Sequence, residues 1–156
     1  MAAACGRDDA RAPDQVVRDL CIAVEARDVA ALEAYAPSGA RSDDRLVKLR
    51  SDLIHQVINH FAGSRTFAPV AYYVDEPYAV VVTREIDEGG GAYEIFFPIY
   101  LLREGGQWHV MSKVLRYQFQ SVFVEQVAID PGAFMRVEHW YARYRTDVIG
   151  GKISVE

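Results

Sequence analysis

The chain has 156 residues, of which 51% are hydrophobic and 25% charged, and its formal net charge is -5 at neutral pH. This length suits a single domain whose core needs neither disulfides nor a metal, and no apolar run approaches the roughly 20 residues that span a bilayer. The negative charge argues against nucleic acid as the main partner, because phosphate binding requires a concentrated basic surface.

The two cysteines, Cys5 and Cys21, are too few for a metal site and do not form a redox Cys-x-x-Cys motif. Cys21 falls at the edge of an apolar helix face, which is typical of a small buried residue. Cys5 follows three alanines and precedes a glycine and a polar stretch, similar to the end of a bacterial lipoprotein signal, although the charged start and apolar stretch of such a signal are missing. Two localisations therefore stay open: cytoplasmic, or the bacterial envelope if Cys5 is lipidated.

Three helices are expected before any strand. Asp14 can cap the first, which runs to about Arg27 with its apolar residues on one arc. Asp28 can cap a short second helix over residues 29–36. A third helix is predicted over residues 42–62, and because apolar residues cover about half of its circumference, it should lie across a sheet or inside a cone.

From Arg65 onward the sequence is rich in Val, Ile, Tyr and Phe, which predicts β-strands. The turn sequences between the apolar runs favour antiparallel hairpins. A proline inside the third run, Pro98, cannot donate to a strand ladder, so a bulge or sharp bend is expected there. Both faces of several strands are apolar, so helices are expected to cover one face, and a partner subunit is a candidate to cover the other. The expected strands span residues 66–74, 78–86, 93–103 and 108–119, with a fifth at about 121–129.

The sequence from residue 130 onward predicts a turn and a last helix over about residues 133–145. This helix should dock on the domain, or serve as a partner-binding arm, through a stripe of mainly aromatic residues: Phe134, Val137, Trp140, Tyr141 and Tyr144. Three segments follow from this reasoning: a leader over residues 1–13, a domain over residues 14–129, and a C-terminal helix and tail over residues 130–156.

The order of these elements resembles the nuclear-transport-factor-2-like superfamily, which includes ketosteroid isomerases and SnoaL-like polyketide cyclases. Residues 26–32, ARDVAAL, look like the joint between the first two helices of that superfamily, and residues 101–110, LLREGGQWHV, look like its closing hairpin. The resemblance covers about residues 14–125. It implies an α+β fold in which a strongly curved antiparallel sheet of four to five strands wraps around three N-terminal helices, with the C-terminal helix added. It also implies a homodimer, because sheet faces in the superfamily often pair.

Enzymes of this superfamily place a carboxylate base in the cone opposite tyrosine donors, and an apolar site can hold such an acid neutral. In this chain the candidate bases are His60 and Glu94, and the candidate donors are Tyr73 and Tyr100. A lone histidine on an apolar helix face is more often a hydrogen-bonded core residue, and Glu94 at a strand start is more often solvent-facing.

The same reasoning gives a ligand-binding set. Trp108 and Ser112 share strand parity, so both should line the cone, whereas His109 should point the other way. With them we expect His60, Tyr73 and Tyr100. No cofactor or metal is expected. The leading hypothesis is a non-catalytic, homodimeric domain that binds a small apolar molecule or a protein partner. The alternative is a cofactor-independent isomerase, cyclase or hydrolase acting on an apolar ring substrate.

Overall fold

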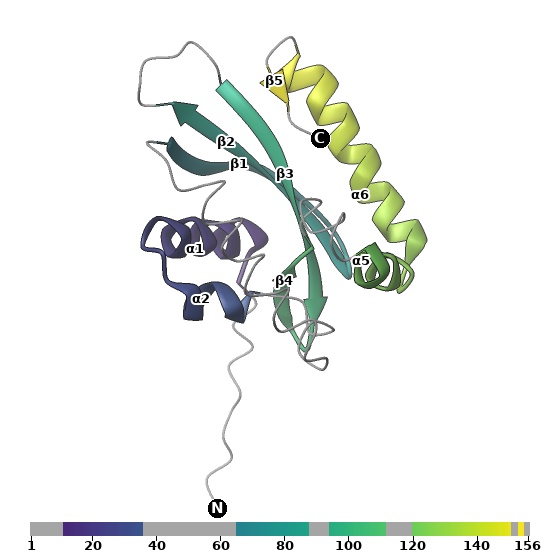
Figure 1. Cartoon of the computed structure of the whole chain (residues 1–156). Coiled ribbons are helices and arrows are strands. Elements are labelled where there is room, and N and C mark those ends of the chain that lie inside the picture. Colours follow the sequence, from purple (N-terminus) through teal and green to yellow (C-terminus); the bar gives the residue numbers. More distant parts are fainter. Residues whose placement is uncertain (1–10, 36–64, 88–93, 112–119, 151–152, 155–156) are drawn as a thin grey trace, which may run out of the picture.

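The computed structural model describes residues 11–35, 65–87, 94–111, 120–150 and 153–154. Helices α1 and α2 come first, four antiparallel strands follow in the order β1-β2-β3-β4, and two helices come after the strands (Figure 1). This confirms the predicted α+β class. The bounds are α1 Pro13–Glu25, α2 Val29–Ala34, β1 Arg65–Asp75, β2 Tyr78–Asp87, β3 Glu94–Glu104, β4 Gln107–Val110, α5 Gln120–Val127, α6 Pro131–Tyr144, a π-helical turn η2 Arg145–Ile149, and β5 Ile153–Ser154.

The helix starts follow from local chemistry. Pro13 occupies the first turn of α1, where its missing N–H has no intrahelical role. As expected, Asp28 caps α2: its side chain accepts a hydrogen bond from the amide of Ala31 at 3.0 Å. Asp130 does the same for α6, where it accepts from the amide of Ala133 at 3.0 Å. The third predicted helix, residues 42–62, lies outside the described residues.

The hairpins of the sheet agree with the turn sequences. Glu76 and Pro77 join β1 to β2, and Gly105 and Gly106 join β3 to β4. Both glycines have positive φ, 57° and 83°, which matches a two-residue turn that only glycine adopts easily. The C-terminal β5 adds a short parallel pairing to β3.

Two expectations about the strands are wrong. The predicted fifth strand, residues 121–129, is helix α5. The start of the predicted fourth strand is β4, which ends at Val110, and residues 112–119 lie outside the described part of the chain. The expected bulge at Pro98 is absent, since β3 pairs with β2 in unbroken register across that proline; the register instead shifts in β1, between Pro69 and Ala71.

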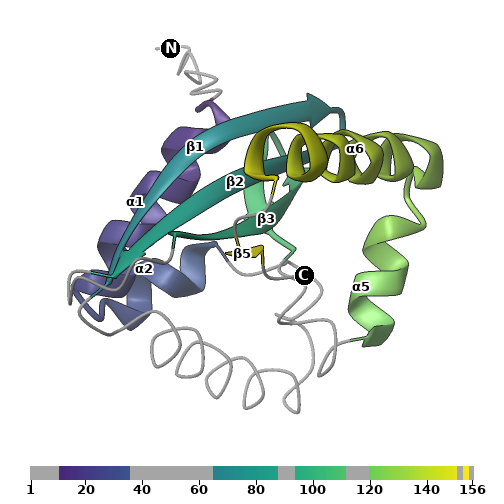
Figure 2. The same ribbon diagram turned by 90° about the horizontal axis from the view of Figure 1, so that it is seen from above.

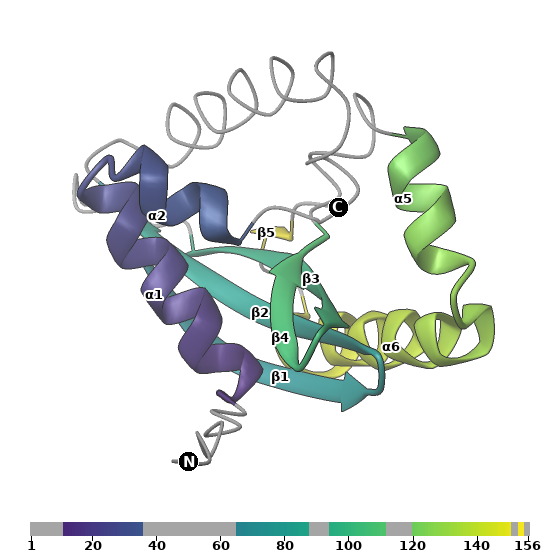
Figure 3. The ribbon, with the colours of Figure 1, turned by 90° about the horizontal axis from the view of Figure 1, so that it is seen from below.

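The sheet separates two hydrophobic clusters. Helices α1 and α2 lie on one of its sides and α6 lies on the other (Figure 1, Figure 3). Along β2 the side chains alternate between the two, as strand geometry requires: Ala79 and Val81 join the α1 side, whereas Val80 and Val82 join the α6 side. Apolar residues on both faces of β2 and β3 are thus covered by helices of the chain, whereas Val70 and Tyr72 of β1 stay exposed.

A buried tyrosine fixes the junction between α5 and α6. The ring of Tyr78 lies on the α6 side, in an edge-to-face contact with Phe134 at 5.4 Å between centroids. Its hydroxyl contacts the carbonyl oxygens of Gln126 and Val127, the latter at 3.1 Å, and accepts a hydrogen bond from the amide of Asp130 at 3.1 Å. One side chain of β2 therefore bonds backbone groups at the end of α5 and at the start of α6, which holds α6 over the sheet.

Candidate functional site

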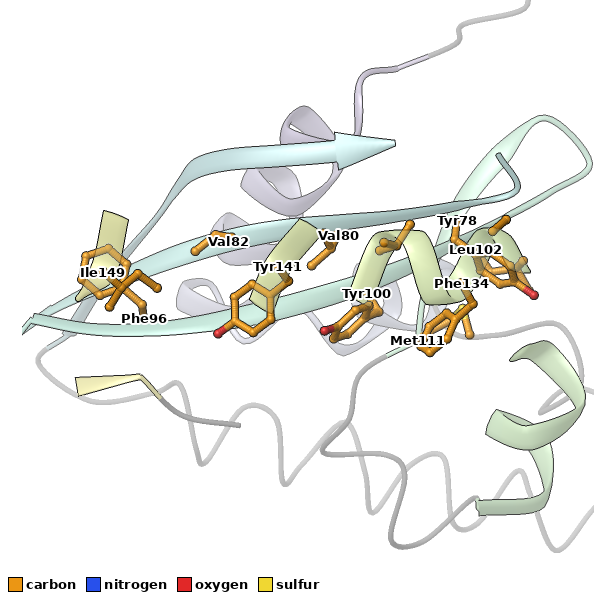
Figure 4. Close-up of a cluster of buried hydrophobic side chains, with 12 residues drawn as sticks. Tyr78, Val80, Val82, Phe96, Tyr100, Leu102, Met111, Phe134, Tyr141 and Ile149 are labelled. Carbon is orange, nitrogen blue, oxygen red and sulfur yellow. The ribbon is translucent and has the colours of Figure 1, made fainter. Parts of the chain in front are cut away.

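Three of the five residues expected to line one cone are described, and they lie on opposite sides of the sheet. Trp108 belongs to the cluster on the α1 side. Tyr100 belongs to the cluster on the α6 side (Figure 4), and Tyr73 packs against that cluster. The remaining two, His60 and Ser112, lie outside the described residues.

Trp108 is a packing residue in this structure. Its side chain is 6% exposed. The guanidinium of Arg103, directly opposite on β3, lies 5.5 Å from the centre of the indole ring, a cation–π contact. The same guanidinium contacts the carboxylate of Glu76 at 2.6 Å. The rest of this cluster is aliphatic: Val16, Val17, Leu20, Ala23, Val24, Ala79, Val81, Ile99 and Leu101.

Two polar side chains that sequence reasoning did not place in the site border this cluster. Tyr35 follows α2, and its carbonyl oxygen accepts a hydrogen bond from the amide of Val110 at 2.8 Å. Burial, together with the nearby carboxylate of Asp19, raises the pKa of the Tyr35 phenol. Burial also raises the pKa of the Cys21 thiol to about 12. The spacing of four between Ala31 and Tyr35, which both pack on the cluster, could have indicated Tyr35.

Tyr100 lies at the centre of the other side, fully buried beneath α6. Burial raises the pKa of its phenol strongly, and the nearby carboxylate of Glu138 raises it further, so this hydroxyl stays protonated. Tyr141 packs edge-to-face on it at 6.5 Å, and the two hydroxyls point the same way (Figure 4). The charge of Arg145 acts in the opposite direction and lowers the pKa of this phenol, although less than burial and Glu138 raise it. Sequence reasoning missed Glu138, although it precedes Tyr141 by three and Arg145 by seven, on one side of the helix.

Tyr73 is part of an aromatic stack between β1 and α6. Its ring lies 5.5 Å from that of Trp140 at an interplanar angle of 10°, and Trp140 lies 5.2 Å from Tyr144 at 20°. Beside the stack, Asp75 accepts hydrogen bonds from two nitrogens of Arg136, at 2.6 and 3.0 Å. These bonds, with one from Tyr73, hold the pKa of Asp75 below its usual value.

Glu94 forms an ion pair with Arg84 of the neighbouring strand, and both side chains are about one-third exposed. The structure thus gives each candidate a separate partner: Glu94 with Arg84, Tyr100 with Glu138, and Tyr73 with Asp75. His109, expected to point away from Trp108, is buried and lies opposite Leu102 of the α6-side cluster.

The described ranges of the chain contain no group of three or more His, Cys, Asp or Glu side chains that could hold a metal ion. Of the helices described there, none is both long and apolar enough to cross a membrane.

Comparison with known proteins supports the fold alone. No protein-family model matches the chain, and no curated protein matches it in sequence. Among solved structures, a protein from Campylobacter jejuni, provisionally described as an NTF2-like transpeptidase, is similar with a TM-score of 0.54 and 14% sequence identity. The similarity covers 64% of this chain and 97% of that one. The chain therefore has the nuclear-transport-factor-2-like fold that residues 26–32 and 101–110 indicated.

Proposed function

We propose that the chain is a non-catalytic binding domain that acts through protein contacts and forms a homodimer. The observation that carries this proposal is that helices of the chain cover both sides of the sheet. α1 packs on one side with aliphatic side chains, and α6 packs on the other with aromatic ones. In the described part of the chain, both sides are filled by the protein itself, which leaves its outer surface for binding.

The enzymatic alternative has less support from the geometry. A general acid or base must come within about 3 Å of the group that it serves, at a site that a substrate can enter. The carboxylate of Glu138 does act on the phenol of Tyr100, but this pair lies beneath α6 and on the side of the sheet opposite Trp108. Glu94, the candidate base, is in an ion pair with Arg84 instead.

A small apolar ligand also has less support than a protein partner. Trp108, the residue expected to receive it, is almost fully buried, and Arg103 covers one face of its ring. A ligand on this side would contact the partly buried border of the cluster, where Tyr35 and Val110 lie.

Tryptophan fluorescence separates these two kinds of binding. The chain has two tryptophans, so Trp140→Phe leaves only Trp108, and the matched control Trp108→Phe leaves only Trp140. Each folded variant is titrated with anilinonaphthalene sulfonate, an apolar ring probe. We expect no saturable quenching of Trp108, together with a concentration-dependent dimer of the unmodified chain in sedimentation velocity. Saturable quenching of Trp108 alone would support a small ligand, and a monomer at every concentration would contradict the homodimer.

We propose that the domain works in the same way in either localisation left open by the sequence. Lipidation of Cys5 would hold it at the bacterial envelope and leave the surfaces described above unchanged. Fractionation of bacterial cells that express the chain, with mass spectrometry of the N-terminal peptide, distinguishes a lipidated Cys5 from a free one.

A further inference from the structure

One edge of the sheet carries unpaired backbone groups. β1 is the outer strand of the β1-β2-β3-β4 order, and it runs along the border of the sheet with α1 on one side and α6 on the other (Figure 2). Within the described residues, no strand pairs with its outer edge. Alternate residues of such a strand direct their N–H and C=O groups outward, so the edge is a template for another strand.

The two halves of β1 differ in how well they could accept a strand. In the first half, Pro69 lacks an N–H, and the register shift between Pro69 and Ala71 marks a bulge. Both features are known to oppose pairing at sheet edges. The second half, Ala71–Asp75, pairs regularly with β2 and contains neither feature. Only this second half presents a regular edge.

Exposed apolar side chains accompany this half. Tyr72 is 46% exposed, and Val70, at the bulge beside it, is 43% exposed. The adjoining helix α1 also exposes a large apolar residue, Ile22. Apolar side chains next to unpaired backbone groups are typical of a surface that another chain covers.

The charge of this half is compatible with a second copy of the chain. Its only charged residue is Asp75, and both oxygens of that carboxylate are bound by Arg136 of the same chain. Two copies with a net charge of -5 would repel each other at long range. At the contact itself, however, the paired strands would not place two unpaired charges next to each other. Antiparallel pairing across a two-fold axis is also self-complementary, so it requires no second kind of protein.

We propose that Ala71–Asp75 pairs antiparallel with the same segment of a second copy, which joins two sheets into one across a two-fold axis. This inference rests on the proposed homodimer and names its surface. With the axis at Tyr73, Tyr72 faces Val74 of the second copy, an aromatic and β-branched pair of the kind that stabilises sheets. Because α1 flanks β1 on the side where Val74 packs, this helix extends the contact toward the roughly 1,200–2,000 Å² that stable interfaces bury.

Two substitutions that each introduce a lysine test the proposed surface, with dimerisation measured by sedimentation velocity over a range of concentrations. Tyr72→Lys places a charge on the proposed edge, and Met135→Lys places the same charge on α6, where Met135 is 56% exposed. We expect the unmodified chain and Met135→Lys to dimerise alike, and Tyr72→Lys to raise the dimer dissociation constant at least about tenfold, since two lysines would then meet near the axis.

Hydrogen exchange on the unmodified chain gives a second readout that depends on no variant. Backbone amides of residues 71–75 should gain protection as the protein concentration rises. A chain that stays monomeric at every concentration overturns both the homodimer and its surface. If the chain dimerises, Tyr72→Lys does not weaken the dimer, and residues 71–75 gain no protection, then the contact does not lie at the β1 edge. That outcome contradicts the proposed surface but not the homodimer. If Tyr72→Lys fails to fold, hydrogen exchange on the unmodified chain alone tests whether residues 71–75 form the dimer contact.

Discussion

Removal of the Tyr78 hydroxyl should destabilise the domain by disconnecting α5 and α6 from the sheet. Tyr78→Phe keeps the ring and its contact with Phe134, so it opens no large cavity. It removes the partner of the Asp130 amide and of the carbonyls of Gln126 and Val127. A net hydrogen bond contributes about 0.5–1.5 kcal/mol, and a buried group left without a partner costs about 1–3 kcal/mol. We therefore expect a loss of about 2 kcal/mol.

Urea unfolding followed by far-ultraviolet circular dichroism measures this loss as a lower midpoint at unchanged slope. A loss of this size corresponds to a fall in melting temperature of about 4–8 °C for a chain of this length. Tyr72→Phe is the matched control, because its ring is 46% exposed, and it should change stability by less than about 0.5 kcal/mol. If Tyr78→Phe is as stable as the control, the three contacts of the hydroxyl do not hold the junction, and the reasoning fails.

Three further outcomes follow from the same structure. Arg136→Gln should lower stability at neutral pH and lose this effect as the pH falls from about 5 to about 2, because the depressed pKa of Asp75 stabilises the fold only while that carboxylate is ionised. If urea unfolding gives the same dependence of stability on pH for the variant and the unmodified chain, the ion pair between Arg136 and Asp75 does not stabilise the fold. In a Cys5→Ser background, Cys21 should react with dithiobis(nitrobenzoate) far more slowly in native protein than in denaturant, since burial raises its pKa to about 12. Ile149→Ala should cost about 2–4 kcal/mol, because the side chain is buried in the α6-side cluster, and a loss below about 1 kcal/mol would show that η2 packs loosely.

The sequence predicted most of the described fold because several local signals agree with the tertiary packing. Alternating apolar residues in β2, and Gly105 and Gly106 in the last hairpin, each favour one local structure, and the fold adopts it. The segment 121–129 is the exception. Its Val and Ile content favours a strand, yet it folds as α5, whose last carbonyls are bound by the distant Tyr78. A contact between residues so far apart in the chain leaves no local sequence signal.

The candidate site was less predictable than the fold. Strand alternation shows which residues share a face, but not which face meets which helix. Tyr73 and Tyr100 were therefore assigned to the cone with Trp108, whereas they lie on the other side, beneath α6. The partners of the buried phenol were missed for the same reason, because Glu138 and Arg145 reach Tyr100 only after α6 docks on the sheet.

The position of α6 at the end of the chain has a consequence for how the protein is made. Strands β1 to β4 have all been synthesised once Val110 is added, but the helix that covers their second side ends at Tyr144. A ribosome adds about 5–20 residues per second, so it takes about 2–7 s to synthesise the intervening segment. During this interval the nascent chain carries an uncovered apolar side that includes Val80, Val82 and Leu102. Chains whose synthesis stops before α6 would keep that side exposed, which makes them substrates for chaperones and proteases.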